Sequence, residues 1–208
     1  VSRGVDLVGG DMWEIAGGPN VIIECAPLPL KPRARLFKDG IDVLIPSVRR
    51  TPPESLSPRA KTHNYLNLIM ADMEAKSQDP EAWAILLDTR GFLTEGIGSN
   101  LFTIKDGVIY TPQEQFVLGG ISRETAIEMA ERIDVPVVAR DIDMFDAMTA
   151  DEVFLTSTSL CICGVRSFQG REIGDGSAAG PITKALMDAY VDFVDFDWIG
   201  QYLKRLES

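Results

Sequence analysis

Two hydrophobic periods alternate irregularly along this chain, and this mixture constrains the fold more than any other feature. The strongest local signal is a hairpin, in which apolar residues 100–104 and 108–110 flank an Asp106-Gly107 turn. Other strand-like runs occupy residues 21–26, 41–45, 83–87, 135–139 and 153–156, and helical patterns occupy residues 64–76, 122–133 and 183–196. Strands and helices mixed in this way, without a regular strand–helix–strand repeat, predict an α+β (mixed α/β) fold.

The first helical pattern has a well-defined apolar stripe. Leu66, Ile69, Met70 and Met73 follow the spacing i, i+3, i+4, i+7 and are predicted to face the core. The second pattern opens near Ser122, which is predicted to be the N-cap of its helix.

Length and charge exclude several classes of protein. The 208 residues can bury a sizeable core, and the net charge of −11 argues against nonspecific binding to nucleic acid or to anionic membranes. No apolar run reaches the length of a membrane-spanning helix. Three cysteines form neither a disulfide framework nor a metal-ligand set, so reduced thiols and a cytoplasmic location are expected.

The N-terminal region differs in composition from the rest of the chain. Residues 1–20 are rich in glycine and are expected to form the end of an N-terminal domain and an interdomain linker, followed by one large domain over residues 21–208. Because Val1 is not a natural start, most of a small N-terminal domain is expected to precede it.

A lysine and a carboxylate stand out as chemically useful. Lys61 lies just before the first helical pattern, and Glu95 follows it by 34 residues in Thr94-Glu95-Gly96. On its own, Lys61 fits a solvated surface position and Glu95 fits an acid in a turn between two strands. Together they could serve an aldehyde cofactor with a pyridine ring, because a lysine amine forms a Schiff base and a buried glutamate keeps the ring nitrogen protonated.

Two further segments could bind a phosphate group. Gly119-Gly120-Ile121-Ser122 ends a loop and opens a helix, where free N–H groups and the helix dipole favour an anion. Residues 156–159 supply four hydroxyl groups after a strand. Each segment alone also fits an ordinary turn, but lysine, carboxylate and phosphate-binding turns together predict a site for pyridoxal 5′-phosphate (PLP).

These motifs, in this order, resemble those of the class IV (fold-type IV) PLP-dependent aminotransferases, which include branched-chain, D-amino acid and (R)-amine transaminases and aminodeoxychorismate lyase. The matching segments are residues 49–53, 61–66, 94–100, 105–112, 120–123, 151–154 and 180–184. The resemblance implies that the chain supplies the family's large cofactor-binding domain.

The resemblance also implies roles for individual residues. Lys61 would form the Schiff base and carry the proton, and Glu95 would pair with the pyridine nitrogen. Residues near the substrate would be Arg3, Ser159 and Leu160, the last narrowing the pocket wall. The phosphate would be held by Ile121 (through its N–H), Ser122 and Thr158, and the phenolic oxygen by Tyr65, which stands one residue nearer the lysine than in branched-chain enzymes.

The implied reaction is transfer of an amino group from an amino acid or primary amine to a 2-oxo acid, in a homodimer. Two alternatives remain at this point: a PLP-dependent lyase of the aminodeoxychorismate lyase type, and a truncated homologue without catalytic activity.

Overall fold

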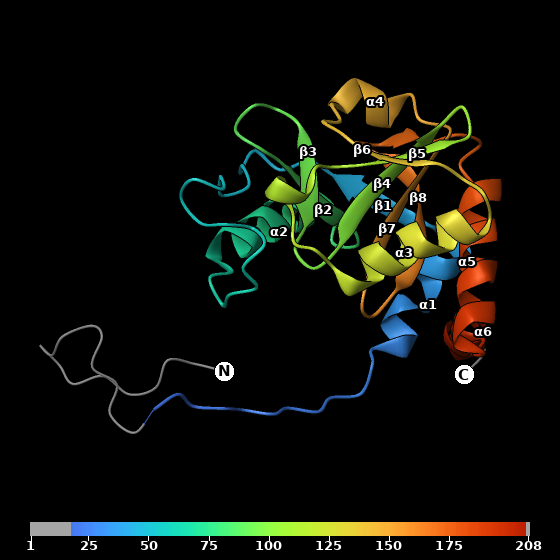
Figure 1. The fold of residues 1–208 in the computed structure, drawn as a ribbon, viewed down its shortest axis with the longest axis horizontal. Helices are drawn as coiled ribbons and strands as arrows, with labels where there is room; N and C mark the ends of the chain where they lie inside the picture. The colour runs from blue at the N-terminus through green and yellow to red at the C-terminus, as the bar shows by residue number, and fades with distance from the viewer. Residues whose placement is uncertain (1–17, 207–208) are drawn as a thin grey trace, which may run out of the picture.

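The computed structural model describes residues 18–206 (Figure 1). The predicted substrate residue Arg3 and most of the predicted linker, residues 1–20, lie outside the described residues. The chain from residue 21 to Pro29 is exposed, and the compact body begins with helix α1 at Leu30.

One mixed sheet of nine strands organises the domain. Its order is β3-β2-β1-β8-β7-β4-β5-β6, with β9 beside β8 and an added pairing between β3 and β4. β1 runs parallel to β2 and to β8, β5 runs parallel to β6, and the other pairs are antiparallel. The strands are β1 (Ile41–Leu44), β2 (Trp83–Leu87), β3 (Leu93–Gly96), β4 (Asn100–Lys105), β5 (Val108–Thr111), β6 (Val137–Ala139), β7 (Glu152–Ser157), β8 (Cys161–Phe168) and β9 (Arg171–Glu172).

The pairing of β3 with β4 closes six of these strands, β3-β2-β1-β8-β7-β4, into a ring. The closure is short and joins Glu95 to Asn100. Side chains alternate between the two faces of each strand, so Leu101 and Leu155 pack in a cluster with Val43 and Ile85 inside the ring. Phe102 and Phe154 point the other way, toward the helices, where their rings stack with centroids 4.6 Å apart.

Helices cover the outside of the ring. α3 and α5 pack on β7 and β8 and on each other, and α1 packs on α6 (Figure 1). α2 lies apart from these helices, against β2. The helices are α1 (Leu30–Asp39), α2 (Leu66–Gln78), α3 (Ile121–Arg132), α4 (Met144–Met148), α5 (Pro181–Val194) and α6 (Trp198–Leu203), with short 3₁₀ turns at Glu114–Phe116 and Lys204–Leu206.

The structure confirms the mixed α/β class, the hairpin, which is β4 and β5, and the strands predicted near residues 41–45, 83–87 and 153–156. The prediction of a strand at residues 21–26 was wrong, because no strand forms there and Val21, Ile22 and Ile23 are 67–87% exposed. α1 was not predicted, because its start is masked by prolines. Pro29 precedes the helix and Pro32 occupies its first turn, a position that proline tolerates.

The predicted helix at residues 64–76 exists as α2, but the prediction of its buried face was wrong. Leu66, Ile69, Met70 and Met73 are 48–68% exposed, whereas Leu68, Ala71 and Ala75 are buried against β2. Two alanines on the inner face let the helix lie close to the strand. The larger apolar side chains therefore remain on the outer surface.

The predicted N-cap of α3 was also wrong. The helix begins at Ile121 with Gly120 in the N-cap position and no side-chain cap. Ser122 lies inside the first turn and is buried, so its hydroxyl does not cap the helix.

Candidate active site

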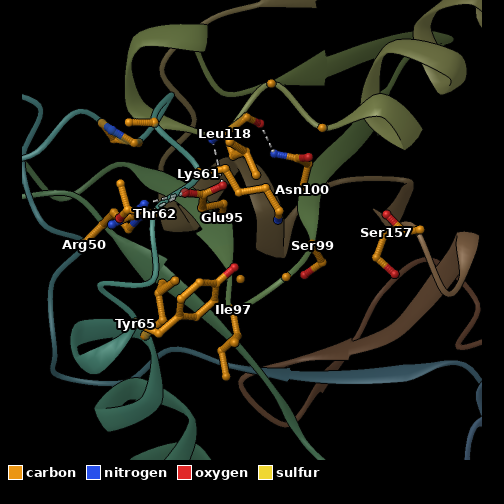
Figure 2. A pocket seen from close by; sticks show the side chains of 18 of the residues that line it. Arg50, Lys61, Thr62, Tyr65, Glu95, Ile97, Ser99, Asn100, Leu118 and Ser157 are labelled. Atoms are coloured by element: carbon orange, nitrogen blue, oxygen red, sulfur yellow. Dashed lines mark hydrogen bonds and ion pairs between the residues drawn. The ribbon is translucent and has the colours of Figure 1, made fainter. Parts of the chain in front are cut away.

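A cavity of about 340 Å³ opens at the place where the ring is closed. Its walls are the loop before α2, the turn between β3 and β4, the loop that starts α3 and the turn between β7 and β8 (Figure 2). Six of the predicted site residues line it: Lys61, Tyr65, Glu95, Ile121, Ser122 and Thr158. Folding thus brings together residues that lie up to 97 positions apart in sequence (158 − 61 = 97).

Glu95 is buried and accepts a hydrogen bond at each of its carboxylate oxygens. It is 5% exposed, and its Oε1 accepts a hydrogen bond from Nε of Arg50 over 2.9 Å and forms an ion pair with Nη2 of the same guanidinium, also over 2.9 Å. Its Oε2 accepts from the N–H of Leu118 over 2.9 Å. Burial raises the pKa of Glu95 above its ordinary value, while the Leu118 N–H, Arg50 and the charge of Lys61 act in the opposite direction.

Lys61 is solvent-exposed, in contrast to Glu95. It lies on the loop that leads into α2, and Figure 2 shows its side chain reaching into the cavity beside Glu95. Tyr65, the residue just before α2, is partly buried and directs its oxygen into the same space from the opposite wall. An amine, a carboxylate and a phenol therefore surround one small volume.

Polar groups without partners line the other walls. The side-chain oxygens of Ser99 and Thr156 are buried and lack a hydrogen-bond partner within the described part of the chain. Burying a hydroxyl without a partner is unfavourable, so these atoms indicate a polar ligand in the cavity. At the start of α3, Ile121 has an apolar side chain that is 80% exposed, so the polar group that it can offer to a ligand is its backbone N–H. This N–H lies next to the buried Ser122.

Arg50 and Asn100 are site residues for which the sequence predicted no role. Asn100 donates from Nδ2 to the carbonyl of Leu118 over 2.9 Å, and its Oδ1 lies so near Gly120 that a Cβ there would come within 2.4 Å. Both residues fall in segments that match the family motifs, at 49–53 and 94–100, and this match was the available signal. Neither contact could be found from spacing, because Arg50 stands 45 residues before its carboxylate partner.

The two remaining predicted residues lie elsewhere. Ser159 borders a second cavity of about 430 Å³, on the α1 side of the turn between β7 and β8. Leu160 is fully buried in the core inside the ring and lines neither cavity.

Comparison with known proteins identifies the family of this chain. The family model described as amino-transferase class IV matches residues 1–168, more than half of the chain. The chain belongs to the class IV aminotransferase family. A putative branched-chain-amino-acid aminotransferase of Methanocaldococcus jannaschii is 38% identical over 193 residues, which are 92% of this chain and 65% of that protein. The branched-chain-amino-acid aminotransferase of Escherichia coli is 34% identical over 173 residues, 82% of this chain and 55% of that protein.

Solved structures of class IV aminotransferases share the fold. The branched-chain enzyme from Escherichia coli superposes with a TM-score of 0.74 at 32% identity, covering 82% of this chain and 56% of that chain. A second branched-chain amino acid aminotransferase, solved in complex with N-(5′-phosphopyridoxyl)-L-glutamate, gives a TM-score of 0.72 at 34% identity, covering 76% and 53%. This chain therefore spans between about half and two thirds of the length of these relatives.

Proposed function

We propose that this protein is a PLP-dependent aminotransferase that exchanges an amino group between an amino acid or primary amine and a 2-oxo acid. The observation that carries the proposal is the shared cavity of the Lys61 amine and the buried, ion-paired Glu95. A lysine on a loop and an acid at a strand end are common separately. Their meeting beside unpartnered hydroxyls and a helix N-terminus is not.

The residues that line the cavity carry the groups needed to bind PLP. Ser99 and Thr156 present unpartnered buried oxygens in the cavity, and α3 begins there with a backbone N–H and the Ser122 hydroxyl. The first turn of a helix favours a phosphate group. Thr158, exposed in the turn between β7 and β8, adds a hydroxyl from the facing wall.

When bound, PLP supplies an electron-withdrawing ring that makes the proton on the substrate carbon removable. Lys61 would hold the cofactor through Nζ and, once released by the incoming amine, take that proton and return it. Tyr65, which directs its oxygen into the cavity, would donate to the phenolic oxygen of the cofactor.

Glu95 would keep the ring nitrogen protonated, which requires the carboxylate to be ionised. Burial opposes ionisation, and the Leu118 N–H and Arg50 act in the opposite direction through one hydrogen bond to each carboxylate oxygen and the ion pair of Arg50 with Oε1. Arg50 thus belongs to the proposed machinery although it does not point at the reacting atoms.

The experiment is a visible absorption spectrum of the purified protein with PLP, before and after L-amino acids, D-amino acids and (R)-amines. The expected result is a long-wavelength band that bleaches with one class of donor and returns with a 2-oxo acid. Lys61→Ala should lose both the band and turnover, whereas Lys184→Ala, on an exposed face of α5, should keep both. Wild-type turnover by Lys61→Ala would refute the proposal.

A product assay tests the first alternative, and the same spectrum tests the second. Pyruvate released from aminodeoxychorismate without any amino acceptor would identify a lyase. A protein that stays colourless with PLP would be a homologue without catalytic activity.

We further propose that the protein works as a homodimer in the cytoplasm. The exposed apolar stripe on α2, formed by Leu66, Ile69, Met70 and Met73, supports association, because apolar surface of this kind is commonly covered by a partner. All three cysteines are unpaired, which fits a reducing compartment, and no described helix is long and apolar enough to cross a membrane. Sedimentation of wild type and Met70→Lys tests the dimer, because the charged variant should be a monomer.

A further inference from the structure

Two helices outside the proposed active site hold one residue of the turn between β7 and β8. Arg33 of α1 donates from Nη1 to the side-chain oxygen of Ser159, and Tyr202 of α6 donates its hydroxyl to the carbonyl oxygen of Ser159. Residues 33 and 159 are 126 positions apart, so only the folded chain brings them together. Ser159 is therefore fixed through its side chain and its backbone at once.

The contact continues from Ser159 toward the proposed active site. The side-chain oxygens of Ser159 and Ser157 lie 3.4 Å apart, and Ser157 also accepts from the N–H of Leu160 over 3.2 Å. Ser157 and Thr158 line the cavity that holds Lys61, and Ser157 also lines the second cavity together with Ser159 and Arg33. The turn is thus a shared wall, with hydroxyls on one side and a guanidinium behind it.

Arg33 is well placed to restrain this wall. It is partly buried, and its guanidinium carbon lies 5.8 Å from the centre of the Trp83 ring. The Trp83 ring and the Ser159 oxygen restrict the guanidinium from two sides. A hydrogen bond from a charged donor is stronger than one between neutral groups, so the contact between Arg33 and Ser159 should restrict the thermal motion of the turn.

We propose that Arg33 is a positioning residue that acts through Ser159 to hold residues 157–160 in the geometry that receives the cofactor phosphate. The proposal rests on the proposed function, because Thr158 binds phosphate only if PLP occupies the cavity. It adds a contribution from α1, a helix that lines no part of the cavity. Without the contact between Arg33 and Ser159, the turn that carries Thr158 would be mobile.

The test is a double-mutant cycle on cofactor affinity. The dissociation constant of PLP is measured by absorbance titration for wild type, Arg33→Ala, Ser159→Ala and the double variant. Each single variant should bind PLP about five- to tenfold more weakly, which lies within the range expected for one lost hydrogen bond. The double variant should be no weaker than Arg33→Ala, because both substitutions remove the same contact.

Controls separate positioning from a general loss of structure. Arg35→Ala, an exposed arginine on the same helix, should bind PLP as wild type does, and Arg33→Lys should recover part of the affinity. At saturating PLP, turnover by Arg33→Ala should stay within about twofold of wild type, because Arg33 does not touch the reacting atoms. Independent, additive effects of Arg33→Ala and Ser159→Ala, or wild-type affinity in Arg33→Ala, would overturn the proposal. Failure of the wild-type protein to bind PLP would instead refute the proposed function.

Discussion

Replacing Arg50 by methionine tests how the fold keeps an acid ionised in its interior. Arg50 and Glu95 are 12% and 7% exposed at their side chains, so solvent does little to screen the pair. Arg50→Met removes the positive charge, the hydrogen bond and the ion pair at Oε1, and leaves the Leu118 N–H on Oε2. Removing one partner of a buried ion pair costs about 3–5 kcal/mol, because the other charge remains buried without compensation.

The sign of the pH dependence follows from the pKa of Glu95. Burial already raises this pKa above the ordinary value of 4.5, so the folded state binds a proton more tightly than the unfolded chain does. The contribution of Glu95 to stability is therefore largest below pH 4.5 and is lost as the pH rises through the folded pKa. Without Arg50 the folded pKa rises further, so this loss extends to higher pH.

The assay is urea unfolding of the cofactor-free protein at pH 7.5 and at pH 5. We expect Arg50→Met to lose about 3–5 kcal/mol at the higher pH and less at the lower pH, where Glu95 can take up a proton. Arg50→Met combined with Glu95→Gln is the matched control, because it removes both charges and keeps an acceptor for the Leu118 N–H. It should recover most of the loss. An equal loss at both pH values, with no recovery in the double variant, would refute the electrostatic explanation.

Three other substitutions give independent tests. Gly120→Ala should destabilise the fold by about 1–3 kcal/mol in urea unfolding, because the new Cβ would meet Asn100 Oδ1 at 2.4 Å. Gly119→Ala is the control, since the nearest atom to its new Cβ is 3.7 Å away. Equal effects of the two substitutions would contradict the packing argument. Phe102→Ala should cost about 3–5 kcal/mol by removing the ring stacked on Phe154, whereas the same change at Phe145, which is 73% exposed, should leave the melting temperature nearly unchanged. Asp42→Asn should reduce the stability that the protein loses on acidification. Hydrogen bonds from Arg166 and then Ser167 lower the pKa of Asp42, so the contribution of Asp42 to the free energy of unfolding is present above its unfolded pKa and is lost as the pH falls. That contribution is at most about 1 kcal/mol because Arg166 is 45% exposed, and an unchanged dependence of stability on pH in the acid range would exclude it.

The sequence predicted local structure best where a short segment carries its own signal. The Asp106-Gly107 turn between two apolar runs specified the β4–β5 hairpin, and the motifs around Lys61, Glu95 and Ile121 identified residues that meet in one cavity. The sequence predicted the structure poorly where contacts with other elements decide which residues are buried. The stripe from Leu66 to Met73 has the period of a buried face, yet Ala71 and Ala75 face β2 because small residues fit against the strand.

What the sequence determined by itself was the mixed class of the fold, the positions of most strands and the residue types needed for the proposed cofactor site. Only the tertiary structure decided how that site is held. The closure of the ring pairs Glu95 with Asn100, and the folded chain brings Arg50 to Glu95 and Arg33 to Ser159 across 45 and 126 residues. Period and propensity describe neighbours along the chain, whereas the pKa of a buried acid and the position of a turn depend on groups that only packing brings near.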